Sequence, residues 1–404
     1  MSTPGTSPAG GPDRDGAPGT LAPPPVPVPA YGAAALADLT PSVGALLGVP
    51  DCRDVLGLGE RSGPVRRVCV LLVDGLGWEL LAAHPEEAPF LTALRGSGRA
   101  ITAGFPSTTA TSLGSLGTGL PPGAHGVLGY LVAVPGTGRL MNSLRWDPEV
   151  DPLTWQPHPT VFERAAAAGV AVRHVGPGFH HGTGLTTAVF RGADYRPADS
   201  PGEVAAVAGL AAGDADRTLV YAYHGDLDRA GHVHGCNSAA WRYQLRHVDL
   251  LARTLAEALP PDALLVVTAD HGMVDIAPER RVDVDRVPAL REGVALLGGE
   301  ARARHVYTRP GAADDVLAAW TALLGDRMWV ASREEAVAQG WFGPDVPAEV
   351  APRIGDVVAA AYGDVAVVAG DAEPLESALT GLHGSMTSAE QHVPLLLARA
   401  GGAL

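Results

Sequence analysis

Short apolar runs alternate along the chain with longer stretches in which apolar and polar residues are mixed. The runs are rich in β-branched residues, so each is predicted to be a strand buried on both faces of a largely parallel sheet. The stretches at 160–168, 201–212 and 238–258 are predicted to be helices that cover this sheet. The predicted strands cover residues 68–73, 100–106, 170–175, 218–223, 263–267 and 393–397.

Two regions differ from this pattern in composition. Residues 1–30 are dominated by Gly, Pro, Ser and Thr, and the segment is predicted to be disordered. Residues 31–404 are predicted to form one large domain. Within it, residues 290–370 mix short apolar runs with a helix at 313–324 and contain no dense cluster of reactive side chains. This is typical of a small inserted α+β subdomain.

The charge balance excludes several classes of partner. The 404-residue chain has 29 Lys and Arg against 44 Asp and Glu, a net charge of −15, so a broad nucleic-acid-binding surface is not expected.

No apolar stretch is long enough to span a membrane, and no basic region followed by an apolar run opens the chain. Cys52, Cys69 and Cys236 are far apart, so neither a disulfide framework nor a cysteine zinc site is expected. We therefore expect a cytoplasmic protein.

Acidic and imidazole side chains follow the predicted strands. Asp270 and His271 come directly after the strand at 263–267, at the edge where open α/β sheets bind ligands. Asp74 follows the strand at 68–73 and precedes a Gly-rich turn. Each feature taken alone is also explained by a polar turn after a core strand, and together they indicate metal ligands.

A second group of candidate ligands lies further along the chain. Asp228 and His232 are four residues apart after the predicted strand at 218–223, so one helical turn brings both to the same cation. Asp226 and His234 are spare candidates, and a solvated loop is the alternative interpretation of the segment. His383 lies in a Gly-flanked loop where little else requires a histidine.

Hydroxyl side chains are concentrated at residues 107–112, Ser-Thr-Thr-Ala-Thr-Ser. They suit a helix N-terminus, where side chains cap free backbone N–H groups and the same groups attract phosphate. Capping alone explains one or two of these hydroxyls. His125 is predicted to be structural, and His180 and His181 are predicted to be loop residues, with a position near the substrate left open.

The candidate groups together match the needs of a two-metal phosphoryl-transfer site. Six Asp and His ligands can hold two cations, one of which activates a hydroxyl nucleophile while the other stabilises charge on phosphate oxygens. Carboxylate and imidazole ligands suit Zn²⁺, and manganese and iron remain alternatives.

The ordered motifs resemble the alkaline-phosphatase superfamily, and within it most closely the nucleotide pyrophosphatase/phosphodiesterase branch. The resemblance implies a three-layer α/β sandwich with a largely parallel central sheet, and the insertion at 290–370 is matched only loosely. The matching motifs are Leu-Val-Asp-Gly at 72–75, Phe-Pro-Ser-Thr-Thr at 105–109, Gly-Thr-Gly-Leu-Pro-Pro-Gly-Ala-His-Gly at 117–126, Asp-Arg-Ala-Gly-His at 228–232, Ala-Asp-His-Gly at 269–272 and His-Gly at 383–384.

The resemblance also implies roles for individual residues. Thr109 is implied to contact the metal and to be the nucleophile, which forms a covalent phospho- or nucleotidyl-threonine, and Thr108 is the rival. Tyr130 stands where the branch usually has a substrate-binding Asn, and its phenol can donate one hydrogen bond to a phosphate oxygen. The ligands implied for the zinc that activates the nucleophile are Asp74, Asp270 and His271, and those implied for the other zinc are Asp228, His232 and His383.

The activity that follows from the resemblance is hydrolysis of phosphodiester or nucleotide pyrophosphate bonds in a small-molecule substrate. A serine nucleophile, an arginine and an extra magnesium site, as in the alkaline phosphatases proper, have no clear equivalent, which favours diesters over monoesters. The alternatives are a phosphomonoesterase or a phosphonate or sulfate ester hydrolase on the same frame. A non-catalytic nucleotide- or metal-binding homologue is a further alternative, and no oligomeric state is indicated.

Overall fold

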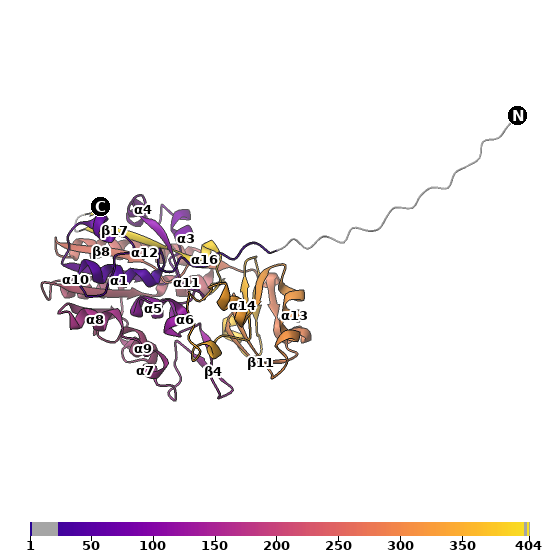
Figure 1. The fold of residues 1–404 in the computed structure, drawn as a ribbon. Helices are drawn as coiled ribbons and strands as arrows, with labels where there is room; N and C mark the ends of the chain where they lie inside the picture. Colours follow the sequence, from indigo (N-terminus) through magenta and orange to yellow (C-terminus); the bar gives the residue numbers. More distant parts are fainter. Residues whose placement is uncertain (2–22, 400–401, 404) are drawn as a thin grey trace.

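A computed structural model describes residue 1, residues 23–399 and residues 402–403. The described chain forms a larger lobe, built mainly from the first two thirds of the sequence and the C-terminal strand, and a smaller lobe beside it (Figure 1). Residues 2–22, most of the segment predicted to be disordered, lie outside the described residues. Residues 23–30 have no regular secondary structure, and the Pro24 carbonyl accepts a hydrogen bond from Trp329 Nε1 at 2.7 Å.

The larger lobe contains an eight-stranded sheet in the order β18-β17-β8-β1-β7-β5-β6, with β2 paired to β17. The neighbours from β8 to β6 are all parallel, whereas β17 runs antiparallel to β8. A mixed α/β fold with a mostly parallel central sheet was predicted and is confirmed. The strands are β1 (Arg67–Val73), β2 (Arg99–Thr102), β5 (Ala171–Gly176), β6 (Asp194–Pro197), β7 (Thr218–His224), β8 (Ala263–Thr268), β17 (His392–Arg399) and β18 (Gly402–Ala403).

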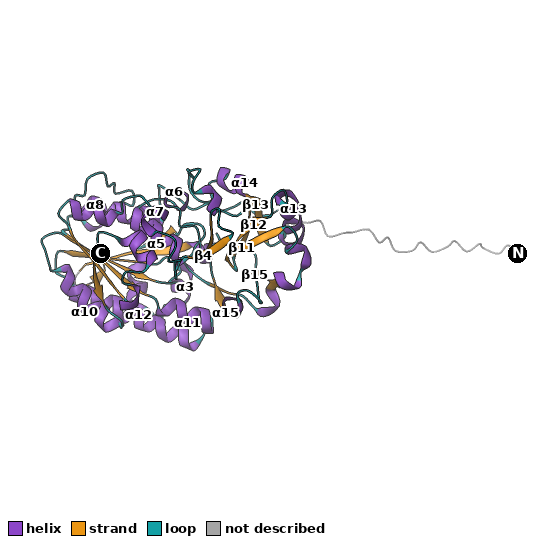
Figure 2. Ribbon diagram, turned by 90° about the horizontal axis from the view of Figure 1, so that it is seen from below, coloured by secondary structure: helices purple, strands orange, loops and turns teal. Residues whose placement is uncertain are grey.

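Helices cover both faces of this sheet, with α5 and α8 on one side and α10 and α12 on the other (Figure 2). The amphipathic pattern at 238–258 corresponds to α12, which buries Trp241, Leu245 and Val248 at helical spacing. The helices of this lobe are α1 (Leu39–Leu46), α2 (Leu58–Ser62), α3 (Trp78–Ala83), α4 (Pro89–Arg95), α5 (Thr109–Thr118), α6 (Pro122–His125), α7 (Pro152–Trp155), α8 (Val161–Ala167), α9 (Gly184–Phe190), α10 (Pro201–Ala212), α11 (Asp226–His234), α12 (Ala239–Ala258) and α16 (Ser388–Gln391).

The smaller lobe is built around a six-stranded sheet in the order β13-β14-β12-β11-β3-β4. Four of its strands come from the region predicted to be an insertion, and the hairpin of β3 and β4 joins them from much earlier in the chain. The strands are β3 (Leu131–Val134), β4 (Arg139–Asn142), β11 (Val294–Glu300), β12 (Ala303–Thr308), β13 (Met328–Ser332) and β14 (Val357–Ala361); the helices are α13 (Ala313–Leu324), α14 (Arg333–Ala338) and α15 (Pro374–Ser377). Two small pairs, β10 (Arg281–Asp283) with β15 (Ala366–Val368) and β9 (Val274–Asp275) with β16 (Gly381–Leu382), complete the sheets.

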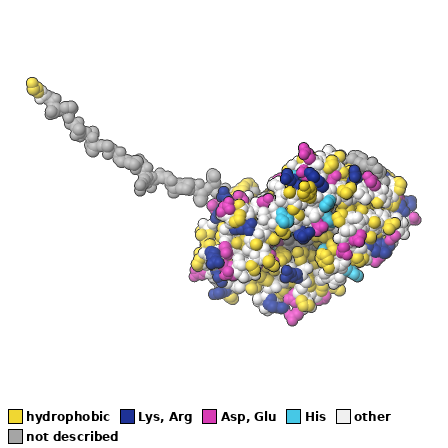
Figure 3. All heavy atoms as spheres, turned by 180° about the vertical axis from the view of Figure 1, so that it is seen from behind, with side chains coloured by type: hydrophobic (Ala, Val, Ile, Leu, Met, Phe, Trp, Pro, Cys, Tyr) yellow, Lys and Arg dark blue, Asp and Glu magenta, His cyan; other side chains and the backbone are white. Residues whose placement is uncertain are grey.

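The surface carries charges of both signs. Basic and acidic side chains are interspersed across the face seen in Figure 3, without a broad basic area. Among the described helices, none combines the length and the apolar character needed to cross a bilayer.

A buried ion pair joins the two lobes. Arg302, on the turn between β11 and β12, donates to both carboxylate oxygens of Glu390 at 3.1 and 2.7 Å. Both side chains are almost inaccessible to solvent. The same carboxylate accepts hydrogen bonds from the Ser385 backbone and the Thr387 hydroxyl, so it anchors the loop that follows His383.

We expect Glu390→Gln to lower the free energy of unfolding by about 3–5 kcal/mol, because Arg302 would remain buried without a carboxylate partner. Equilibrium denaturation in urea measures this change. The more exposed pair of Asp326 and Arg327 provides the control, since Asp326→Asn should alter the free energy by less than about 1 kcal/mol. Equal and small effects of the two substitutions would contradict the structural role given to the buried pair.

Candidate active site

Three neighbouring parallel strands deliver acidic residues to one edge of the large sheet. Strand β1 lies between β7 and β8, and Asp74 directly follows it. Asp270 follows β8, and the loop after β7 leads at once into α11. Because the carboxyl ends of parallel strands meet at the same edge, residues that are far apart in sequence converge there, as the motifs predicted.

Asp74, Asp270 and His271 form the first cluster. One potential ligand atom from each lies within 4.8 Å of the others, and all three side chains are buried. His271 Nε2 is 3.4 Å from Asp74 Oδ1 and 3.5 Å from Asp270 Oδ2. These atoms surround a space suited to one cation.

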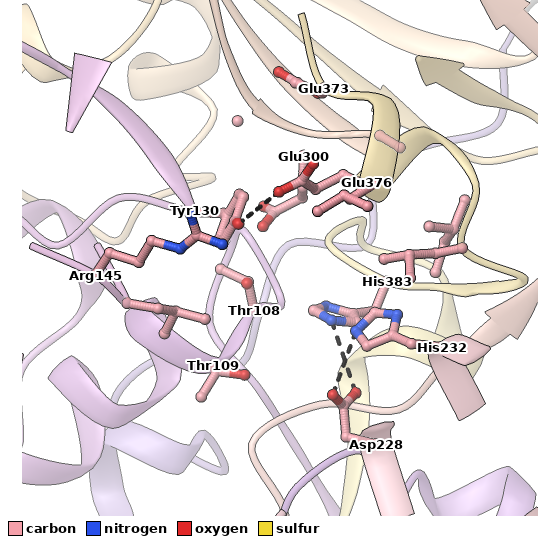
Figure 4. Close-up of a pocket in the computed structure, with 16 residues that line it drawn as sticks. Thr108, Thr109, Tyr130, Arg145, Asp228, His232, Glu300, Glu373, Glu376 and His383 are labelled. Atoms are coloured by element: carbon pink, nitrogen blue, oxygen red, sulfur yellow. Dashed lines mark hydrogen bonds and ion pairs between the residues drawn. The ribbon is translucent and has the colours of Figure 1, made fainter. Parts of the chain in front are cut away.

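Asp228, His232 and His383 form the second cluster, with the same mutual limit of 4.8 Å between ligand atoms. Asp228 and His232 lie one turn apart on α11, and their Oδ2 and Nε2 atoms are 3.3 Å apart. His383 Nε2 approaches the other oxygen of Asp228 to 4.0 Å. Figure 4 shows both imidazoles directed at this carboxylate.

The two clusters adjoin through a glycine. Gly75 has a φ of +74°, and a Cβ built on it would lie 3.0 Å from Asp228 Cβ. A larger residue would therefore be strained in backbone conformation and would push α11 away from Asp74. The rings of His271 and His383 are stacked with centroids 3.5 Å apart, which places one ligand of each cluster in direct contact.

Thr109 lies beside the first cluster at the start of α5. Its Oγ1 is 3.2 Å from His271 Nε2, and the residue is half-buried, so its hydroxyl is accessible from the adjoining cavity. The backbone N–H groups of the first helical turn point toward the same region, where they favour negative charge. Thr108 precedes the helix and lines the cavity, but no contact joins it to either cluster.

The hydroxyls near Thr109 connect loops instead of capping the helix. Thr108 is the N-cap residue, and its side chain makes no capping hydrogen bond. Ser107 Oγ donates to the Ser385 carbonyl at 2.6 Å, and Ser112 Oγ donates to the Asp270 carbonyl at 2.7 Å. The polar run therefore holds α5 against the two loops that carry Asp270 and His383.

Each histidine of the two clusters is oriented by a backbone carbonyl. Nδ1 of His232 lies 2.7 Å from the Gly381 carbonyl, Nδ1 of His271 lies 2.9 Å from the Gly272 carbonyl, and Nδ1 of His383 lies 3.0 Å from the Ser107 carbonyl. A carbonyl can only accept, so each Nδ1 carries the proton and each Nε2 presents a lone pair to its cluster.

Burial sets the protonation of these groups. It raises the pKa of Asp270 to about 6, and together with the charge of Asp270 it raises the pKa of Asp74 well above the usual range. Burial also raises the pKa of Asp228 and lowers that of His271 to about 4. The imidazoles are thus neutral and the carboxyl groups hold protons readily. In this state metal cations and protons compete for the same oxygen and nitrogen atoms.

The donor set fits divalent metal ions. Asp74 Oδ1, Asp228 Oδ1 and Asp270 Oδ2 are buried and accept no hydrogen bond from the described residues. Buried carboxylate oxygens without a partner are costly, and a cation between them removes that cost. Tyr223, which donates a hydrogen bond to Asp74 Oδ2, was not identified from the sequence, although it is the next-to-last residue of β7, the strand beside β1.

A cavity of about 360 Å³ opens beside Thr109 and extends toward the smaller lobe. Tyr130 lines it, but its hydroxyl donates to Glu376 Oε1 at 2.9 Å, as Figure 4 shows. Arg145 and Glu300 also line this cavity, and neither was singled out from the sequence because the fold alone brings them to the site.

A second cavity, of about 210 Å³, shares Thr109 and Asp228 with the first and is lined mainly by residues of the larger lobe. It is lined by aromatic and hydroxyl side chains, including Tyr221 and Tyr223. His180 lines it as well, which places one of the two adjacent histidines near the site, whereas His181 stacks on Tyr195.

The remaining candidates lie outside the two clusters. Asp226 makes a partly exposed ion pair with Arg229, and His234 is exposed at the end of α11. His125 is buried between the Ser115 hydroxyl at 3.1 Å and the Val127 backbone N–H at 3.1 Å, which is a structural position.

Comparison with known proteins identifies the family. Residues 68–386 match the family model described as type I phosphodiesterase / nucleotide pyrophosphatase. A curated phosphopentomutase from Anaeromyxobacter dehalogenans (strain 2CP-C) is 29% identical over 158 residues, covering 39% of this chain and 38% of that protein. The chain thus matches well under half the length of this curated relative.

Solved structures have the same fold. Murine ectonucleotide pyrophosphatase / phosphodiesterase 5, in an inactive form in complex with AMP, matches with a TM-score of 0.65 and 21% identity over 83% of this chain and 88% of that chain. Phosphonoacetate hydrolase from Sinorhizobium meliloti 1021, in complex with phosphonoformate, matches with a TM-score of 0.63 and 19% identity over 83% and 91% of the two chains. The chain belongs to the type I phosphodiesterase / nucleotide pyrophosphatase family of the alkaline-phosphatase superfamily.

Proposed function

We propose that this protein hydrolyses phosphodiester or nucleotide pyrophosphate bonds through a covalent intermediate on Thr109. The observation that carries the proposal is the position of the Thr109 hydroxyl, 3.2 Å from His271 Nε2. It lies beside the first cluster of candidate metal ligands and at the wall of an open cavity, which the second cluster also lines. A hydroxyl in this setting is an activated nucleophile for phosphoryl transfer.

The family is metal-dependent, and the two clusters supply a site for each of two divalent ions. Asp74, Asp270 and His271 would hold the ion beside Thr109, and the second cluster would hold the other. Carboxylate and imidazole donors favour zinc. When bound, the ions lower the pKa of the threonine hydroxyl and stabilise negative charge on the phosphate oxygens.

In the proposed reaction, Thr109 Oγ1 gives its proton to solvent water and forms a bond to phosphorus. The bond to the leaving oxygen breaks, and the leaving group takes a proton from water. A water molecule then attacks the phospho-threonine, which restores the hydroxyl and releases the second product. The N–H groups of the first turn of α5 orient the phosphate toward Thr109.

Two cavities beside Thr109 favour a diester over a monoester. Both are lined by Thr109 and Asp228, and they extend in different directions from these residues. A diester carries two organic groups and fills both cavities, whereas a monoester leaves one of them to water. Tyr130 would donate to a phosphate oxygen only after leaving Glu376.

Turnover on a panel of esters tests the substrate class. We expect metal-loaded protein to hydrolyse bis(p-nitrophenyl) phosphate faster than p-nitrophenyl phosphate, a phosphonate or a sulfate ester. Faster hydrolysis of the monoester or the phosphonate would replace the diesterase assignment with one of those activities on the same frame. Metal binding without turnover of any ester would favour a non-catalytic homologue.

Replacement of the nucleophile should abolish the reaction. We expect Thr109→Ala to lower kcat for the diester by at least about a thousandfold, because the group that attacks phosphorus is removed. The metal content, measured by plasma emission spectroscopy, should stay near two ions per chain. Thr108→Ala is the matched variant one residue away and should keep most of the activity. The opposite result would identify Thr108 as the nucleophile.

Metal binding should release protons and weaken with falling pH. The pKa of Asp270 is raised to about 6, so below that pH this carboxyl is protonated in the metal-free protein and a cation must displace the proton. We expect apparent zinc affinity to fall by about tenfold per displaced proton for each pH unit below about 6. Calorimetric titration in two buffers of different ionisation enthalpy counts the released protons. Zinc binding at pH 5.5 without proton release would contradict this.

A further inference from the structure

Glu300 ends β11 and lines the larger cavity beside Thr108 and Thr109. Both of its carboxyl oxygens are shielded from solvent, and neither makes a well-formed hydrogen bond with the described residues, although the Thr108 hydroxyl and the Tyr130 backbone N–H lie nearby. Burial raises the pKa of this carboxyl to about 8, against the weaker opposing effects of the Thr108 hydroxyl and Arg304. A buried carboxyl group without a partner is unfavourable for folding, so its position calls for a ligand.

The chain makes room for this side chain with a glycine. A Cβ on Gly384 would lie 2.6 Å from Glu300 Cγ and 3.2 Å from Oε1, so no other residue fits there without displacing the carboxyl group. Gly384 directly follows His383, and its φ of +131° is one that other residues rarely adopt. The Glu300 carboxyl is therefore held next to the second cluster of ligands.

The other glutamates around Glu300 already have partners. Glu373 forms a two-point ion pair with Arg304 at 3.0 and 2.8 Å, and Glu376 accepts a hydrogen bond from Tyr130. The negative charge of Glu390 also raises the pKa of Glu300, and Glu390 is paired with Arg302. Among the glutamates of this cavity, Glu300 is thus the one that a bound molecule would have to satisfy, whereas Asp228 belongs to the second cluster of ligands (Figure 4).

The cavity wall around Glu300 indicates what kind of molecule would do so. Ala301, Leu375, Leu379 and Leu382 supply apolar surface that suits a short alkyl chain. A carboxyl oxygen at the end of such a surface accepts a hydrogen bond from an amine or a hydroxyl. An arm that ends in a methyl group would leave the Glu300 oxygens without a partner.

We propose that Glu300 is a specificity-determining residue that selects phosphodiesters with a hydrogen-bond donor, an amine or a hydroxyl, on the short alkyl arm next to phosphorus. This inference rests on the proposed phosphodiesterase function and narrows its substrate class. To contact the substrate arm, the Glu300 carboxyl must turn toward the cavity, because its oxygens are covered in the protein without ligand. Thr109 carries the reaction.

Symmetrical diesters test the inference, because the same arm then enters both cavities. Bis(2-aminoethyl) phosphate, bis(2-hydroxyethyl) phosphate and dipropyl phosphate have arms of nearly equal size that end in an ammonium, a hydroxyl and a methyl group. Their Kd values would be measured by calorimetry on zinc-loaded Thr109→Ala protein, which cannot turn them over. We expect the two donor arms to bind about tenfold to a hundredfold more tightly than the propyl arm.

Substitutions at Glu300 separate recognition from general electrostatics. Glu300→Met has similar volume and no oxygen, so it should remove both preferences. Glu300→Gln keeps a carbonyl acceptor but cannot become a carboxylate when an ammonium binds, so it should keep the hydroxyl preference and reduce the ammonium preference. Glu334→Gln is the control for removal of one carboxylate, since Glu334 is exposed on α14 and lies outside the cavity wall. It should leave the ratios among the three ligands unchanged.

Two results would overturn the inference. One is equal affinity for the three diesters in the Thr109→Ala protein, and the other is a preference for donor arms that survives Glu300→Met. Thermal unfolding of each variant verifies that it is folded. If Glu300→Met is not folded, Glu300→Gln gives the decisive comparison. Turnover by the wild-type protein distinguishes failure of this inference from failure of the proposed function. If only the role of Glu300 were wrong, the wild-type protein would still hydrolyse bis(p-nitrophenyl) phosphate.

Discussion

The burial of three carboxyl groups at one edge of a parallel sheet is the constraint on which the site depends. Asp74, Asp228 and Asp270 lie close together, and each has an oxygen that accepts no hydrogen bond from the described residues. Carboxylates so placed repel one another and lose hydration, so they either keep protons or share cations. The neutral histidines beside them supply the lone pairs that make cations the better solution.

The two lobes contribute different parts of this site. The larger lobe provides the proposed nucleophile and most of the candidate metal-ligating atoms, at strand ends and helix starts. The smaller lobe provides Glu300 and the wall around it, and the buried pair of Arg302 and Glu390 fixes that wall relative to the loop of His383. Substrate preference can therefore depend on side chains that take no part in holding the metals.

Sequence patterns predicted the parts of the molecule in which local chemistry and fold agree. The strands at 68–73 and 263–267 are uniformly apolar, and the polar residues that follow them have no local reason to be there, so Asp74 and Asp270 stood out. Glu300 carries no such signal, because a glutamate at the end of a short strand is ordinary until tertiary packing buries it. The hairpin of β3 and β4 was likewise missed as part of the smaller lobe, since its sheet partners lie more than a hundred residues away.

The backbone carbonyls that hold the histidine rings have an evolutionary consequence. Gly381, Gly272 and Ser107 act through main-chain oxygens, which every amino acid possesses. Ring orientation is thereby inherited with the course of the polypeptide and survives drift in the neighbouring side chains. Related proteins with this fold can therefore exchange the residues of the cavity wall and bind different substrates, while the orientation of the three histidines stays the same.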